Sequence, residues 1–185
     1  MPPKVSIVLP TYNGAQRLRR SIESCLSQTC EDIELIIVDD GSTDETPAIL
    51  SSYSTPRLSW VRHTANQGLP AALNAGFARA AAPFLTWNSD DNFYAPHAAA
   101  RMLEFLEAAP QYGFVYCDFY SFKEDAVDVL HHERLEDQPR FEVGNSVGPC
   151  FLYRREVMER VGEYDRETIL AEDYDYWIRI SKQFR

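Results

Sequence analysis

The sequence has few basic residues, few cysteines and no long apolar run, and each shortage excludes a class of protein. Its 18 Lys and Arg stand against 28 Asp and Glu, giving a net charge of -10. Such a balance argues against a nucleic-acid partner, which binds a basic surface. No uncharged run is long enough to cross a bilayer, so we expect no membrane segment in this chain. The four cysteines form no metal-type pair and nothing resembles a secretory signal, so we expect reduced thiols in a cytoplasmic protein.

Glycine-rich phosphate-binding loops are absent too. No G-x-G-x-x-G follows the first predicted strand, which argues against a dehydrogenase. The glycine-rich loop with Lys or Arg that nucleotidyltransferases place there is also missing, and no nucleophilic Ser or Cys signature is present. The 185 residues are 45% hydrophobic and 12% aromatic, which is enough for the core of one folded domain.

Strands and helices alternate along the first part of the chain. Predicted strands cover residues 5–9, 33–38, 58–61 and 84–87, and predicted helices cover residues 18–27, 46–52, 69–82 and 97–108. This order predicts a single α/β domain with a mostly parallel central sheet, right-handed crossovers and helices on both faces. Further along, we expect strands over 114–120, 126–130 and 147–153, helices over 155–161 and from 172, and a surface loop over 131–142.

An acidic turn, Asn88-Ser89-Asp90-Asp91-Asn92, follows the fourth predicted strand. Adjacent carboxylates at the end of a buried strand repel each other, and a bound cation relieves that repulsion. Hard oxygen ligands in a turn suit Mg²⁺ or Mn²⁺. The alternative is a helix N-cap with two solvated carboxylates. The loops 10–14 and 39–44 also follow carboxyl ends of strands, where open α/β sheets bind ligands, and this favours the ligand site.

With these loops placed, the chain resembles the family 2 glycosyltransferases, which are inverting enzymes of the GT-A fold. The motifs that carry the resemblance occur in the family's order: Val8–Gly14, Val38–Ser42, Ser89–Asp91, and Glu172–Asp173 with Trp177. The string Asp90-Asp91-Asn92-Phe93-Tyr94-Ala95-Pro96 is most similar to the spore-coat polysaccharide synthase type. The resemblance covers residues 4–180.

The resemblance implies a site for a UDP-sugar. Tyr12 would lie against the base, and Asp40 would accept a hydrogen bond from uracil N3–H, while Asp39 or Asp40 could instead cap the next helix. Asp90 and Asp91 would share the ribose and the metal, Mn²⁺ or Mg²⁺, with Asp91 the main cation ligand. The full set of implied nucleotide-binding residues is Pro10, Thr11, Tyr12, Asp39, Asp40, Asn66, Asn74, Ser89 and Asp90.

The resemblance also implies the chemistry. Asp173 would be the general base that takes the proton of the acceptor hydroxyl, with Glu172 as its competitor, and either acid could instead be a charge at a helix N-terminus. The expected reaction is a metal-dependent, inverting transfer to a saccharide or lipid-linked saccharide in cell-surface or extracellular polysaccharide synthesis. A non-catalytic nucleotide- or sugar-binding domain on the same fold is the alternative.

Three departures from the family pattern bear on these roles. Asn88 stands where many relatives have another Asp, and Leu73 stands where many have an arginine. Relatives also continue past the position of Arg185, so we expect a longer protein. We expect residues 1–110 to form a nucleotide-binding half and residues 111–185 an acceptor and catalytic half.

Overall fold

The computed structural model describes residues 2–123, 130–168 and 170–184, and its centre is a six-stranded mixed sheet. The strand order is β3-β2-β1-β4-β8-β5. β1 (Val5–Thr11), β2 (Ile33–Asp39), β3 (Leu58–Arg62) and β4 (Phe84–Trp87) are parallel, whereas β8 (Phe151–Arg154) runs antiparallel to both β4 and β5 (Phe114–Tyr116). The predicted parallel sheet is therefore present, and strands from the later part of the chain complete it.

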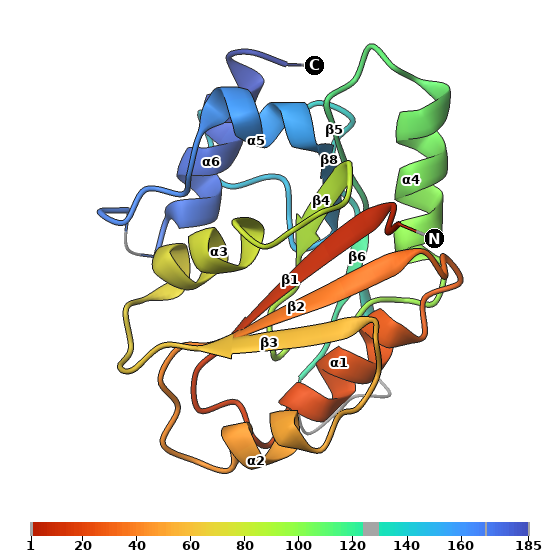
Figure 1. The fold of residues 1–185 in the computed structure, drawn as a ribbon. Coiled ribbons are helices and arrows are strands. Elements are labelled where there is room, and N and C mark those ends of the chain that lie inside the picture. Colours follow the sequence, from red (N-terminus) through yellow and green to blue (C-terminus); the bar gives the residue numbers. More distant parts are fainter. Residues whose placement is uncertain (1, 124–129, 169, 185) are drawn as a thin grey trace.

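Helices cover both faces of this sheet (Figure 1). On one face lie α1 (Leu18–Leu26), α2 (Thr46–Ser51) and α4 (Ala98–Ala108), and on the other lie α3 (Leu69–Phe77), α5 (Arg155–Val161) and α6 (Glu172–Ser181). Because successive side chains of a strand point to opposite faces, Ile7 and Leu9 join the first core while Val8 joins the second. Burial on both faces explains the near-continuous apolar runs of β1 and β2.

β1 is longer than predicted, since Pro10 does not end it. β4 stops at Trp87, which pairs with Val8, so no neighbouring strand remains on that side of β1 beyond this point. The backbone of Thr11 faces β2, where its carbonyl accepts a 2.8 Å hydrogen bond from Asp40 N. Pro10 therefore faces the side of β1 on which β4 has already ended, so its missing N–H does not remove a hydrogen bond of the sheet.

The predicted helix over 69–82 was too long, since α3 ends at Phe77. The N–H groups of Ala81 and Ala82 donate to Glu34 Oε1 at 2.7 and 3.2 Å, and Ala82 N also donates to Ser6 Oγ at 3.0 Å. Side chains of β1 and β2 thus satisfy the backbone that leads into β4, in place of a longer helix.

The predicted strand over 114–120 divides into β5 and β6 (Phe119–Ser121), which belong to different sheets. β6 pairs with β7 (His131–Glu133), so the surface loop predicted over 131–142 was wrong for its first residues. The strand predicted over 147–153 is confined to β8, because Gly148, with a φ of 73°, and Pro149 precede it. The predicted strand over 126–130 falls mainly on 124–129, outside the described residues.

The helix over 155–161, ended by Gly162 with a φ of 86°, was predicted correctly. Within the described residues, no helix is both long and apolar enough to cross a membrane.

Candidate active site

The loops that follow β1, β2 and β4 meet at one edge of the sheet, as the sequence predicted. Thr11 pairs with Asp39 across β1 and β2, so these two predicted site residues are neighbours. The acidic turn starts beside the same strand, because Asn88 N donates a 2.9 Å hydrogen bond to Val8 O. Parallel pairing alone accounts for this convergence, since the carboxyl ends of parallel strands share an edge.

Asp90 is held by the end of β1. Thr11 Oγ1 donates to Asp90 Oδ2 at 2.6 Å, and Thr11 is itself buried. Gly14 lies against the same carboxylate, where an added Cβ would sit 2.2 Å from Oδ2. Burial raises the pKa of Asp90, the Thr11 hydrogen bond opposes this, and the charge of Asp91 adds to the rise. The loop after β1 therefore fixes one carboxylate of the pair in a desolvated position.

Asp91 contrasts with its neighbour because it is exposed and makes no hydrogen bond or ion pair with the described residues. The turn beneath it is closed by Asn88, a buried residue whose Nδ2 donates to Asn92 O at 3.2 Å. Among the described residues there is no group of three or more His, Cys, Asp or Glu that could hold a metal. The carboxylates of Asp90 and Asp91 still fit Mg²⁺ or Mn²⁺, because proteins often hold these ions with one or two carboxylates plus water and phosphate oxygens.

Asp40 organises the loop 63–68, which borders the turn after β2. Its Oδ1 pairs with His63 Nδ1 at 2.7 Å, and its Oδ2 accepts from Gly68 N at 2.8 Å. Gln67 N is shared by the two oxygens at 3.0 and 3.1 Å. Three donors therefore make four hydrogen bonds to a carboxylate with about four lone-pair positions, so a further donor would have to replace one of them.

Asp39 has a different role, and neither acid caps α2. Asp39 Oδ1 accepts from Ser42 N at 2.8 Å, which shapes the turn after β2, and its Oδ2 lies 3.2 Å from Arg62 Nε. The N–H of Thr46, at the start of α2, instead donates to Asp44 Oδ1 at 2.9 Å. Asp44 therefore caps the helix, in place of Asp39 or Asp40 as the sequence predicted.

Tyr12 and Asn66 present free surface at this edge. Tyr12 is 48% exposed, which is unusual for a large aromatic residue at the end of a core strand. Asn66 is exposed, and its Oδ1 accepts from Gly68 N at 3.0 Å. Ser89 is half-buried, and Pro10 is buried within β1.

The sequence did not predict a role for Asn13, which joins the loops after β1 and β2. Asn13 adopts a φ of 53°, and its Oδ1 accepts from Thr43 N at 2.8 Å while its own N–H donates to Ser42 Oγ at 2.9 Å. Asparagine tolerates this left-handed conformation better than most residues, which was the available signal. The two loops are therefore fixed to each other.

Asn74 lies in α3 and forms a link within the protein. Its Nδ2 donates to Tyr164 O and its Oδ1 accepts from Tyr164 N, both at 2.9 Å and both buried. The ring of Tyr164 stacks on Tyr176 of α6 with centroids 4.0 Å apart, and its hydroxyl accepts from Trp87 Nε1 at 3.1 Å. Tyr164 thus connects the end of β4 to α3 and α6. Both polar atoms of the Asn74 side chain are therefore engaged within the protein, away from the role in nucleotide binding that was predicted for it.

Asp173 lies in the first turn of α6 and is half-buried. Its Oδ2 accepts from Asn145 Nδ2 and its Oδ1 from Tyr174 N, both at 2.7 Å. The N-terminal end of a helix favours a negative charge. Glu172 is only 8% exposed, so Asp173 is the more accessible acid of the pair. Asn145, in a segment without regular structure, carried no signal in the sequence.

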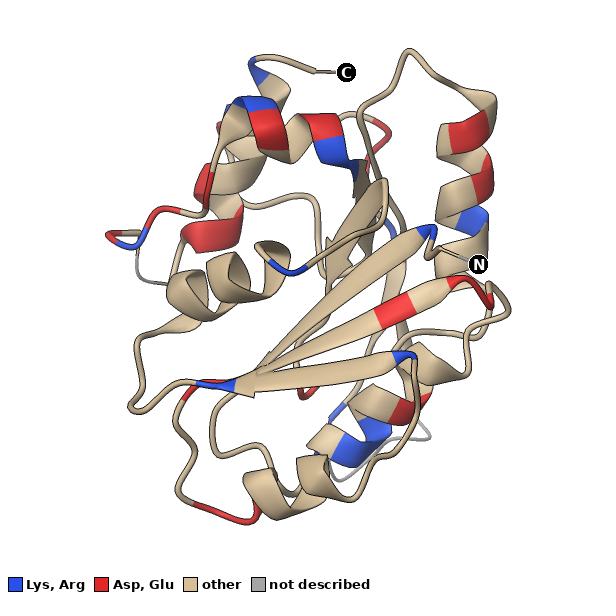
Figure 2. Cartoon of the chain, in the orientation of Figure 1, with Lys and Arg blue, Asp and Glu red and all other residues tan. Residues whose placement is uncertain are grey.

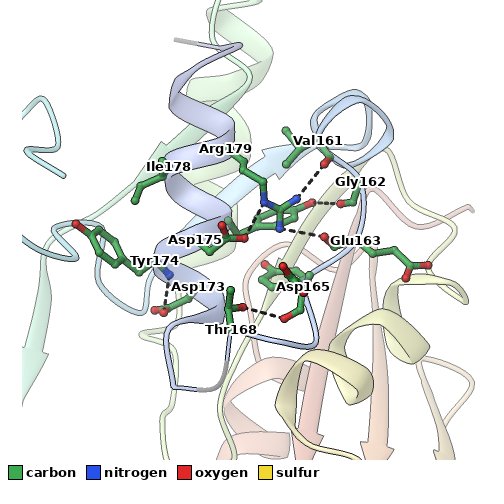
Figure 3. Close-up of polar contacts among 12 residues, drawn as sticks. Val161, Gly162, Glu163, Asp165, Thr168, Asp173, Tyr174, Asp175, Ile178 and Arg179 are labelled. Carbon is green, nitrogen blue, oxygen red and sulfur yellow. Dashed lines mark hydrogen bonds and ion pairs between the residues drawn. The ribbon is translucent and has the colours of Figure 1, made fainter. Parts of the chain in front are cut away.

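The rest of α6 is firmly held, as Figure 3 shows for Arg179. Its guanidinium pairs with Asp175 at 2.7 Å and donates to Val161 O, in the last residue of α5, at 2.9 Å and to Glu163 O, just after α5, at 3.0 Å. Trp177, which the sequence resemblance singled out, is 1% exposed and packs edge-on against Phe151 of β8. The helix that carries Asp173 is therefore fixed to the sheet.

Comparison with solved structures shows which fold this is. The S. aureus protein TarS, solved as residues 1–349 in complex with UDP, gives a TM-score of 0.78 at 18% identity, over 96% of this chain and 54% of that one. The mannosyltransferase PcManGT from Pyrobaculum calidifontis, in complex with GDP-Man and Mn²⁺, gives 0.75 at 20% identity, over 100% of this chain and 54% of that one. The predicted GT-A fold is confirmed.

Sequence comparisons identify the family. An uncharacterised glycosyltransferase of Nostoc is 31% identical over 189 residues, covering 88% of this chain and 54% of the relative. One of Rickettsia prowazekii is 29% identical over 187 residues, covering 96% of this chain and 58% of the relative. The chain thus spans a little over half the length of these relatives. The model of the family "Glycosyl transferase family 2" matches residues 6–162, and the chain belongs to that family.

Proposed function

We propose that this chain is the nucleotide-sugar domain of an inverting, metal-dependent glycosyltransferase that moves a sugar from a UDP-sugar to a hydroxyl acceptor. The observation that carries the proposal is the pairing of two unlike carboxylates at the edge of the sheet. Asp90 is held by a hydrogen bond from Thr11 and is partly desolvated by burial, whereas Asp91 is exposed without a partner among the described residues. Family membership supports the transferase class.

The nucleotide would lie across the loops after β1 and β2. The exposed ring of Tyr12 offers a face to the base at little conformational cost. Asp40 would accept a hydrogen bond from uracil N3–H in place of the one that Gln67 N shares between its two oxygens. Thr11, Asp39, Asn66 and Ser89 surround this path, and Asp90 is placed for the ribose. The complex of TarS with UDP supports a uridine nucleotide.

The proposed cation, Mn²⁺ or Mg²⁺, would be held by Asp91 with help from Asp90. Such an ion neutralises the charge that develops on the departing diphosphate. The Mn²⁺ in the complex of PcManGT supports this assignment. Asp91 needs no rearrangement of internal hydrogen bonds to take a cation, since it makes none with the described residues.

Asp173 would be the general base. The acceptor hydroxyl gives its proton to a carboxylate oxygen of Asp173 while the acceptor oxygen forms the bond to the anomeric carbon and the bond to UDP breaks. One displacement inverts the configuration and needs no nucleophile on the protein. Asn145 would act as a positioning residue, since its 2.7 Å hydrogen bond holds Oδ2 in a single orientation.

We further propose that the acceptor is a saccharide or lipid-linked saccharide, used in cytoplasmic steps of polysaccharide synthesis. The test combines binding and turnover on the full-length protein. Calorimetry with UDP, GDP and dTDP, with and without Mn²⁺, should show the tightest binding for UDP with the cation. UDP-sugars with a pool of saccharide acceptors should then release UDP. Binding without turnover would favour a non-catalytic sugar-binding domain, and absence of nucleotide binding would contradict both.

A further inference from the structure

A cavity of about 450 Å³ opens beside the acidic turn. It lies between the first half of α1, the acidic turn and β6, and Asp91 is part of its wall. The nucleotide-binding assignments do not use this cavity. Its wall includes Arg20 from α1, Arg17 from just before that helix, Tyr120 from β6, and Pro149.

Arg20 is prepared to bind an anion. Its guanidinium carbon lies 3.5 Å from the ring centroid of Phe93 and 5.1 Å from that of Phe122. These two rings hold the flat face of the guanidinium, which leaves the N–H groups at its edge free. Within the described residues the guanidinium of Arg20 makes no hydrogen bond or ion pair. A planar, oriented guanidinium of this kind binds carboxylate or phosphate through paired hydrogen bonds.

Among the described residues, basic side chains outnumber acidic ones in the wall of the cavity. The chain carries a net charge of -10, yet the described residues that line this cavity include Arg17, Arg20 and one acid, Asp91. Figure 2 shows basic and acidic residues together on α1, α4 and α5, with the basic residues in excess on α1. The guanidinium of Arg20 therefore offers a positive charge to an anionic ligand on a protein that is acidic on average.

Tyr120 adds an aromatic platform. Tyr120 is 59% exposed, and its ring stacks on His132 with centroids 5.0 Å apart. His132 is held in turn by Asp118, whose Oδ2 lies 3.1 Å from its Nε2. An exposed aromatic ring that is already fixed offers apolar contact area without a large loss of side-chain entropy.

The cavity also lies close, along the chain, to the residue that contacts the proposed base. Asn145 donates to Asp173, and Pro149, four residues further along, lines the cavity. Four residue steps span at most about 14 Å when fully extended. A short oligosaccharide can bridge such a distance.

We propose that this cavity binds a sugar residue of the acceptor that carries an anionic group, carboxylate or phosphate. Arg20 pairs with the anionic group and Tyr120 packs against the sugar ring. This inference rests on the proposed function, because it assigns the acceptor of the same reaction.

The test uses matched ligands: methyl β-D-glucuronide, methyl β-D-glucoside 6-phosphate, neutral methyl β-D-glucoside, and inorganic phosphate. Dissociation constants from ligand-observed NMR should be at least tenfold lower for the two anionic sugars than for the neutral glucoside or for phosphate alone. Arg20→Gln should abolish the preference for anionic sugars, and Arg20→Lys should keep part of it. Tyr120→Ala should reduce binding of the sugar phosphate to the level of inorganic phosphate.

Arg19→Gln is the control, since it removes the same charge from the adjacent position of α1, where Arg19 contacts Ser52 and Tyr53. Equal binding of neutral and anionic sugars, or an equal effect of Arg19→Gln and Arg20→Gln, would overturn the proposal. UDP binding reports on folding and on the proposed function separately. Normal UDP binding with no saccharide binding refutes this inference alone. If the wild-type protein does not bind UDP, the proposed function is refuted, and the dissociation constants of the saccharides still test whether the cavity binds anionic sugars.

Discussion

The hydroxyl of Thr11 donates a 2.6 Å hydrogen bond to Oδ2 of Asp90, although 79 positions separate the two residues. The contact joins the end of β1 to the acidic turn after β4. The orientation of one carboxylate therefore depends on a residue of the central sheet. The neighbouring Asp91 is left exposed, so the two acids of the pair are prepared for different roles.

This contact can be tested with two substitutions at one site. Thr11→Val removes the hydroxyl while keeping the shape, so Asp90 should lose its fixed orientation and UDP affinity should fall by roughly 1 kcal/mol, the worth of one hydrogen bond. Thr11→Ser keeps the hydroxyl and should bind UDP nearly as the wild type does. Calorimetric titrations of both variants make the comparison. Equal affinities for the two variants would show that the contact only stabilises the fold.

The cation should act through Asp91. Asp91→Ala should remove most of the gain in UDP affinity that Mn²⁺ or Mg²⁺ provides, because the ligand oxygens are lost. Glu31→Ala, an exposed acid that precedes β2 at the opposite edge of the sheet, should keep the gain. Calorimetry in EDTA and in Mn²⁺ measures it. The metal role is wrong if the wild-type protein binds UDP equally well in both.

Base selection should depend on Asp40. Asp40→Ala should weaken UDP binding by roughly 1–3 kcal/mol and blunt the preference over nucleotides that lack the N3–H donor. His63→Gln is the companion variant, because it changes one partner of Asp40 while leaving the carboxylate in place. It should keep the preference. An unchanged preference in Asp40→Ala would limit Asp40 to holding the loop 63–68.

Transfer should depend on Asp173. Asp173→Asn cannot take a proton, so the transfer rate should fall by roughly 10²–10⁴-fold while UDP-sugar binding stays nearly intact. Glu172→Gln should cost much less. Asn145→Ala should lower kcat by less than Asp173→Asn does, since it only frees the orientation of the base.

These rates need a form of the protein that is active as wild type. Near-wild-type turnover in Asp173→Asn would refute the mechanism. A larger loss in Glu172→Gln would exchange the roles of the two acids.

Asp44 should make part of the stability depend on pH. Burial tends to raise its pKa, but hydrogen bonds from Thr46 and from Ala15 N outweigh it, so the pKa lies below the ordinary value of 3.8. A lowered pKa means that the folded state favours the ionised form. The contribution is therefore complete above pH 3.8 and disappears as the pH falls through the folded-state value.

Urea unfolding measures this effect. Asp44→Ala should lower the free energy of unfolding near neutral pH by roughly 0.5–1 kcal/mol, as for the loss of an exposed cap. The difference from wild type should shrink well below pH 3.8. Glu45→Ala is the control, because the adjacent acid makes no capping hydrogen bond. A difference that is the same at both pH values would mean that the charge of Asp44 is irrelevant.

The sequence by itself determined the order of strands and helices in the first part of the chain and the edge at which the site lies. Apolar runs bounded by turn residues identify β1, β2 and β4 because strands buried on both faces can contain little else. Parallel pairing then brings Thr11, Asp39 and the acidic turn to one edge. These conclusions need only local pattern and the rules of sheet connection.

Tertiary structure decided how each polar group is used. Asp40 bonds to residues 63–68, Asn74 to Tyr164 and Asp173 to Asn145, and each partner is 23 or more positions away. A propensity cannot distinguish a carboxylate that awaits a ligand from one that holds a loop, since both favour the same turns. Residues 114–120 divide between two sheets for the same reason. β8 pairs with the first part of this apolar run, and β7 pairs with the last part. Pairing partners that lie far along the chain settle that choice.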